Sequence, residues 1–230
     1  MVQLYTPNEI DQLQQDIPYL VETWNWLRSF LAKPHPELGR NGNVCPYMPK
    51  ALNSNCIRLK VIRSQNLGRQ EISDIVLSYR NAFLDLEPKN KEESIYKAII
   101  LIFPEIKNEE ATILIDSIQK QLKPFFVESG LMLGEFHKRN ETGGLHNPNF
   151  RPLRSPIPML AIRFMVESDL PFLLSADDLY SQVRYLEAYL KQFRKKFKDE
   201  NKFKTACQAL DLAKKQIAKE NNLIFYEINQ

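Results

Sequence analysis

The sequence predicts an α+β protein with a single mixed β-sheet, helices packed on that sheet and long helices at both termini. Four short apolar runs have strand length, and longer segments with apolar residues at helical spacing separate them. The expected strands are Cys56–Arg63, Ile95–Phe103, Leu131–Phe136 and Pro158–Val166. With 230 residues and 43% apolar composition, the chain can bury a sizeable core, and we expect one domain over residues 1–230.

The first helix is expected over residues 7–32. Thr6 and Glu9 have the spacing of a capping box, and Pro7 suits the first helical position. Apolar residues then recur every three or four positions, and we expect Trp24 to be buried in the core. This helix and the C-terminal helices are expected to pack onto the sheet through apolar stripes and to take no part in chemistry.

Other segments follow in order along the chain. Helical spacing predicts helices over Glu71–Leu86, Glu109–Phe126 and residues 177–221. A last short strand is expected at Ile224–Ile228. Two irregular segments remain, residues 33–55 and residues 137–158, and both are rich in Pro, Gly and Asn.

Composition disfavours several classes of function. The net charge of +3 is too small to indicate nucleic-acid binding, and the basic run Lys191–Lys198 has the pattern of a solvated helix face. The longest apolar run, Ala98–Phe103, is far too short to cross a membrane. Three cysteines do not make a disulfide framework, and the N-terminal residues lack signal-peptide features, so we expect a cytoplasmic protein.

The segment of residues 130–164 carries the strongest site signal. It contains His137, His146 and four of the seven glycines, and its polar loop joins two apolar strands. A long polar loop held by rigid elements is where binding groups usually lie. The third histidine, His35, lies in the other irregular segment, and we expect both segments to face one cavity.

The patterns of the common metal and nucleophile sites are absent from the sequence. No His or Cys pair has the spacing typical of structural zinc, although His137, Glu135 and His146 could form a two-histidine, one-carboxylate iron site. There is no GxSxG, P-loop or GxGxxG motif. Pro46 follows Cys45 and offers no amide donor for an oxyanion hole, so Cys45 is interpreted as a structural thiol.

Arg151 and Arg154 flank Pro152 on a stiff backbone, which suits bidentate recognition of a carboxylate. Two interpretations stay open for this pair. The arginines form an internal salt bridge, or they bind an anionic ligand such as a substrate carboxylate or the propionates of a haem.

Three blocks carry a family resemblance: HPELGRNGNVCPYMPKAL, GEFHKRNETGGLHN and FRPLRSPIPMLAIRFMVESDLPFL. They resemble a bacterial domain family with CPxxP, GEFH and RxPxxMLAIR blocks in this order, over roughly residues 20–200. More distantly, the layout is similar to the YqcI/YcgG-type proteins, some of which are haem-dependent enzymes that oxidise an amine nitrogen of amino acids. The resemblance implies a haem with a histidine axial ligand, and without a CxxCH motif that haem would be non-covalent.

On this basis we expect a haem-dependent oxygenase that acts on the amine nitrogen of a small amino-acid-like substrate. His137 directly follows a strand and is expected to be the axial ligand and metal-binding residue, with Arg151 and Arg154 on the propionates. His146 is expected to be the catalytic, distal group, although the two histidines could exchange roles. Two alternatives stay open: a non-catalytic protein that binds haem or another anionic small molecule, and a non-haem metal enzyme using His137 and His146. Whether the protein forms a homodimer is also open.

Overall fold

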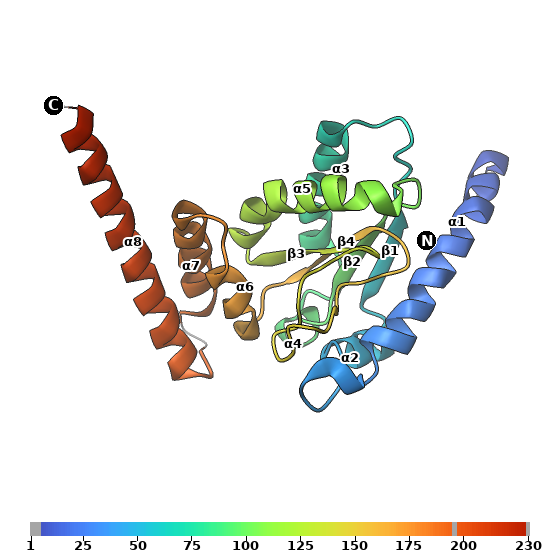
Figure 1. Cartoon of the computed structure of the whole chain (residues 1–230). Coiled ribbons are helices and arrows are strands. Elements are labelled where there is room, and N and C mark those ends of the chain that lie inside the picture. The colour runs from blue at the N-terminus through green and yellow to red at the C-terminus, as the bar shows by residue number, and fades with distance from the viewer. Residues whose placement is uncertain (1–5, 195–196, 229–230) are drawn as a thin grey trace. The chain divides into compact units, whose positions relative to one another are not determined.

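The computed structural model describes residues 6–194 and 197–228, and it confirms the α+β class with one mixed sheet and helices at both ends (Figure 1). Four strands form the sheet in the order β1-β2-β4-β3. Their bounds are Ile57–Val61 for β1, Ala98–Ile102 for β2, Leu131–Phe136 for β3 and Met159–Phe164 for β4.

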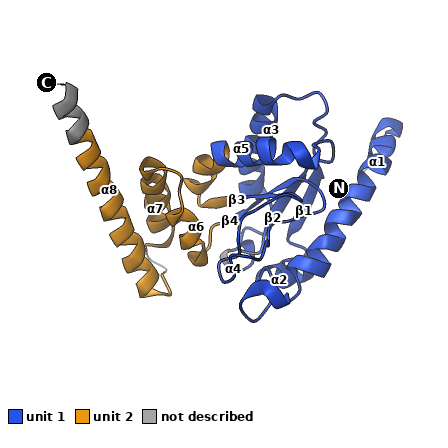
Figure 2. Cartoon of the chain, in the orientation of Figure 1, with its two compact units in different colours: residues 1–121, 133–163 blue, residues 122–132, 164–230 orange. Residues whose placement is uncertain are grey.

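The chain groups into two compact units, where one domain was expected (Figure 2). Unit 1 comprises residues 1–121 and 133–163, and unit 2 comprises residues 122–132 and 164–230. Unit 1 contains most of the sheet and both irregular segments that carry histidines.

The central strand β2 pairs with β1 in parallel, with Val61 opposite Ile102. It pairs with β4 in the antiparallel sense, with Ile102 opposite Met159. Ile99 to Ile102 are all buried, as expected of a strand covered on both faces. The helical elements of unit 1 are α1 (Pro7–Trp26), the π-helix η1 (Leu27–Leu31), the 3-10 turn η2 (Pro36–Leu38), α2 (Met48–Asn53), α3 (Arg69–Asp85), α4 (Lys91–Ser94) and α5 (Asn108–Val127), the last of which runs on into unit 2.

The core of unit 1 joins one face of the sheet to η1, α2 and both irregular segments. Leu27 in η1 is fully buried, and Phe150 and Ile157 of the second segment belong to the same apolar cluster as Ile102 and Met159. The irregular segments therefore lie against the sheet and contribute to its core.

Helix α1 begins at the expected capping box, but its orientation differs from our prediction. Trp24 is 37% exposed, so the prediction that it is buried in the core is wrong. A polar contact holds the helix to the rest of unit 1: Asp16 forms an ion pair with Arg63, which lies just after β1. Helical periodicity predicts that the apolar residues of α1 lie along one side, but it does not predict which side of the helix packs on the rest of the protein.

Unit 2 has its own apolar cluster, built from α6 (Leu170–Leu174), α7 (Leu179–Phe193) and α8 (Glu200–Ile228). Tyr189 of α7 is fully buried, its hydroxyl donates to the carbonyl of Glu167 at 2.7 Å, and burial raises the pKa of its phenol. The expected strand at Ile224–Ile228 is wrong, because α8 continues through these residues. Within residues 6–194 and 197–228, no helix combines the length and apolar character needed to cross a membrane.

The packing of unit 1 predicts contrasting costs for two leucine truncations. Leu27→Ala removes a fully buried side chain and should lower the free energy of unfolding by about 2–5 kcal/mol. Leu84→Ala in α3, where the side chain is 41% exposed, should change it by less than about 0.5 kcal/mol. Urea denaturation of both variants checks this, and equal losses would contradict the placement of Leu27 at the centre of the core.

Candidate functional site

The connection between β3 and β4, residues 137–158, leaves the sheet at the end of β3 and rejoins it at the start of β4. Ile62 donates to the carbonyl of Ile102, and Phe103 donates to the carbonyl of Pro158. The carboxyl ends of the parallel strands β1 and β2 therefore lie beside the point where this connection returns. Ligand sites in sheets with parallel strands commonly lie at such an edge.

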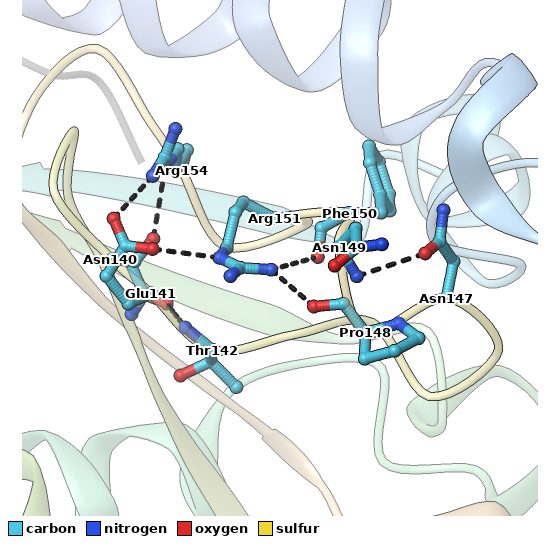
Figure 3. A network of polar contacts seen from close by, with 9 residues as sticks. All are labelled: Asn140, Glu141, Thr142, Asn147, Pro148, Asn149, Phe150, Arg151 and Arg154. Carbon is cyan, nitrogen blue, oxygen red and sulfur yellow. Dashed lines mark hydrogen bonds and ion pairs between the residues drawn. The ribbon is translucent and has the colours of Figure 1, made fainter.

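A network of polar contacts folds this connection onto itself (Figure 3). Glu141 accepts from Nε of Arg151 at 3.0 Å and from the guanidinium of Arg154. Nε of Arg154 also donates to the carbonyl of Asn140 at 3.1 Å, and Arg151 donates to the carbonyl of Pro148. One carboxylate thus holds two arginines that lie ten and more residues further along the chain.

The two guanidinium groups lower the pKa of the Glu141 carboxyl, and the hydrogen bond from Arg151 is the largest single cause, followed by the hydrogen bond from Arg154. Because the pKa is lowered in the folded state, the ion pairs are fully formed above the ordinary glutamate range and are lost as the pH falls through the lowered value. Of the two interpretations for Arg151 and Arg154, the structure shows the internal salt bridge, and the carboxylate expected beside Arg154 is that of Glu141.

The two irregular segments, which were expected to face one cavity, are in direct contact. The ring of His35 stacks on Phe150 at 4.6 Å, and Nδ2 of Asn147 donates to the carbonyl of Glu37 at 2.8 Å. Gly39 has a φ of 75°, and a Cβ there would lie 2.5 Å from the carbonyl oxygen of His146. Only glycine permits so close an approach with this backbone conformation. We call this region, residues 33–47 and 137–158, the two-loop junction.

The cavity expected at the two-loop junction is not one of the two clear surface cavities of the described chain. One, of about 590 Å³, is lined by the polar side of α1 together with Arg63, Leu67 and Glu105. The other, of about 520 Å³, lies between the end of α1 and α2.

His137 is completely buried and held by one partner. Its Nε2 lies 2.9 Å from Oδ1 of Asp116 on α5, and its Nδ1 is buried with no hydrogen-bond partner among the described residues. A histidine with one nitrogen on a carboxylate and the other enclosed has no open side for a bulky group. The structure thus gives His137 a contact between β3 and α5.

His146 has the opposite environment. Its side chain is exposed, and in the part of the chain that the structure describes its ring has no hydrogen bond or ion pair. Its backbone is fixed by the close approach of Gly39. His35 differs again, because its Nδ1 accepts from the backbone amide of Glu37 at 3.2 Å and caps η2. Of the three histidines, His146 has the ring most accessible to a ligand.

Within residues 6–194 and 197–228, no three His, Cys, Asp or Glu side chains are grouped so that they could hold a metal ion. The set of His137, Glu135 and His146, considered as an iron site from the sequence, is therefore not assembled. His137 instead pairs with Asp116.

The comparison with protein families adds one result. A family model matches residues 20–204, and its description is a domain of unknown function, DUF6875. The chain belongs to this family. The matched residues include both segments of the two-loop junction. Neither a curated protein nor a solved structure matches the chain.

Two residues of the site were not identified from the sequence. Glu141 has a usable signal, because it is the one acidic residue between His137 and Arg154 in a loop with three arginines. Asp116 has none, because it lies on a helix 21 residues before His137 and only the fold brings the two together.

The Glu141 network predicts a change in protease sensitivity. In Glu141→Gln the ion pairs to Arg151 and Arg154 are weakened, so the backbone after Arg154 should open more often and trypsin should cleave it faster. Mass spectrometry of timed digests at neutral pH measures the rate at this one bond. The matched control is Glu109→Gln, which removes the exposed ion pair with Arg139 and should leave that rate unchanged. Equal rates in all three proteins would show that Glu141 does not hold the loop.

Proposed function

We propose that this protein binds haem at the two-loop junction with His146 as the iron ligand, and that it acts as a haem-dependent oxygenase on the amine nitrogen of a small amino-acid-like substrate. The exposed, uncommitted ring of His146 on a loop whose backbone is fixed is the observation that carries the proposal. The resemblance to the YqcI/YcgG-type proteins supports the choice of haem and of the reaction. The axial role first assigned to His137 thereby passes to His146, and His137 keeps its buried contact with Asp116.

The residues of the junction fit this group in part. His146 can offer a ring nitrogen, and the aromatic surface of His35 and Phe150 lies in the same junction. His137 does not fit the axial role, because it is fully buried and its Nε2 is taken by Asp116. Arg151 and Arg154 fit a propionate only by exchanging Glu141 for it, since both already bind that carboxylate.

The charge of the junction favours an anionic ligand. Two guanidinium groups share one carboxylate, so the network of Arg151, Arg154 and Glu141 keeps one net positive charge. Arg154 and Glu141 are 49% and 68% exposed, so an incoming anion can reach them without unfolding the loop. A carboxylate or propionate that approaches this network meets donors already held in place.

The bound haem would supply the iron that activates oxygen. The chain's own contribution is to position and to select. The close approach of Gly39 fixes the backbone of His146, from which the ring nitrogen would reach the iron. Arg151 and Arg154 orient an anionic group, and Glu141, once displaced, becomes available to a substrate amine.

A hemin titration followed by Soret absorption tests the proposal. The wild-type protein should give a saturable Soret band, and His146→Ala should lose it or weaken its affinity at least about tenfold. His137→Ala should keep the band while the protein becomes less stable, because it loses a buried contact. If wild-type protein binds no hemin, the proposal fails; if only His137→Ala loses the band, His137 is the ligand.

A second candidate is a non-catalytic protein that binds haem or another anionic small molecule, which the net positive charge of the arginine network favours equally. Turnover separates the two functions. Haem-loaded protein supplied with oxygen and a reductant should convert an amino acid to its N-hydroxylated product. Haem binding without any turnover across the common amino acids would leave the binding function alone.

A further inference from the structure

Five large apolar side chains lie along the outer side of α1. Ile10, Leu13, Ile17, Val21 and Trp24 are 46%, 37%, 48%, 50% and 37% exposed. A different side of the helix meets the rest of unit 1: Tyr19, Leu20 and Trp26 pack against its core cluster, beside the Asp16–Arg63 ion pair. We call these five residues the α1 stripe.

The α1 stripe is a continuous patch. Its residues are three or four positions apart, so they form one row along about 21 Å of helix. A monomer seldom leaves a row of large apolar side chains in water, and such patches usually mark an interaction surface. Within unit 1, α1 lies at the outer edge beside β1, with its outer side uncovered (Figure 2).

The charges of α1 disfavour a membrane as the partner. The helix carries Glu9, Asp11, Asp16 and Glu22 and has no Lys or Arg. Helices that bind membrane surfaces usually carry Lys and Arg on the polar side, which anionic lipids attract. Such lipids repel an acidic helix, which favours a protein surface as the partner of the stripe.

The spacing of the α1 stripe is symmetric about its middle residue. Ile10 and Trp24 are each seven positions from Ile17, and Leu13 and Val21 are each four positions from it. We propose that α1 packs antiparallel against α1 of a second copy, across a two-fold axis at Ile17. Ile10 then faces Trp24 of the second copy, Leu13 faces Val21, and the two Ile17 residues face each other.

The ends of the stripe are complementary in charge. The Glu9 carboxylate accepts from the backbone amide and the hydroxyl of Thr6, at 2.7 and 2.8 Å, so its negative charge lies at the start of α1. Arg28, just after α1, is exposed, and its guanidinium carbon is 6.0 Å from the centre of the Trp24 ring. In the antiparallel pair, Arg28 of each copy lies opposite Thr6 of the other and hence close to the Glu9 carboxylate. The opposed helix dipoles are also favourable.

The exposed apolar area of the α1 stripe limits the expected stability of the dimer. Five side chains that are one third to one half exposed offer a few hundred Å² per copy, which is less than the roughly 800 Å² per partner of a standard stable interface. The dimer should therefore dissociate on dilution. The proposal rests on the residues of α1 and does not depend on haem binding at the two-loop junction.

Sedimentation velocity of the full chain over a range of concentrations tests the pairing. Wild-type protein should change from monomer to dimer as concentration rises. Ile17→Glu places two carboxylates face to face on the axis and should weaken dimerisation roughly 100-fold or more.

The control is Ile113→Glu on α5, where the isoleucine is 78% exposed and outside the stripe; this variant should dimerise like wild type. Circular dichroism should show that both variants are folded, and the milder Ile17→Ala should also weaken the dimer if Ile17→Glu does not fold.

Cysteine cross-linking tests the orientation. Ile17→Cys should form a disulfide between copies under mild oxidation, and Ile10→Cys should cross-link when mixed with Trp24→Cys but not with itself. Wild-type protein on the same gel accounts for its own three cysteines. A monomer at every concentration, or a dimer that survives Ile17→Glu, overturns the proposal. Self-linking of Ile10→Cys would instead show a parallel pair and overturn the two-fold axis at Ile17.

Discussion

The ion pairs of Glu141 with Arg151 and Arg154 are the constraint on which the candidate site depends. Strands β3 and β4 are neighbours in the sheet, yet residues 137–158 connect them, far more chain than a hairpin needs. Ordering that chain costs conformational entropy. The Glu141 carboxylate binds Arg151 and Arg154 and so joins the first part of the connection to its second part. Phe150 and Ile157 add buried apolar surface. The tip that carries His146 is thereby brought against Gly39.

The two histidines of this connection lie in opposite environments, one buried and one exposed. His137, next to the strand, is enclosed and bonded to Asp116, so its position is exact but its ring is committed. His146, at the tip, is exposed, and only its backbone is constrained. A position fixed by the sheet favours packing, whereas a ligand needs an open ring. The expectation that His137 is the ligand rested on the rigidity of its position, whereas the open ring is that of His146.

Much of the fold could be predicted from local patterns. The run Leu131–Phe136 coincides with β3, and the Thr6–Glu9 pair marks the start of α1, because strand hydrophobicity and helix capping are encoded within a few residues. What depended on distant partners could not be predicted. Trp24 faces outward while Tyr19, Leu20 and Trp26 of the same helix pack against the core of unit 1, and Asp116 meets His137 only in the folded sheet. Ile224–Ile228 has strand composition but continues α8.

The measurement that tests the central claim most directly is hydrogen–deuterium exchange of the full chain with and without hemin. If the ligand binds at the two-loop junction, exchange should slow in residues 33–47 and 137–158 together, because the ligand then orders both loops. Residues 63–67, which line part of the larger surface cavity, should be unaffected. Slower exchange confined to residues 63–67 and α1, or no change under saturating hemin, would contradict a haem site at the junction.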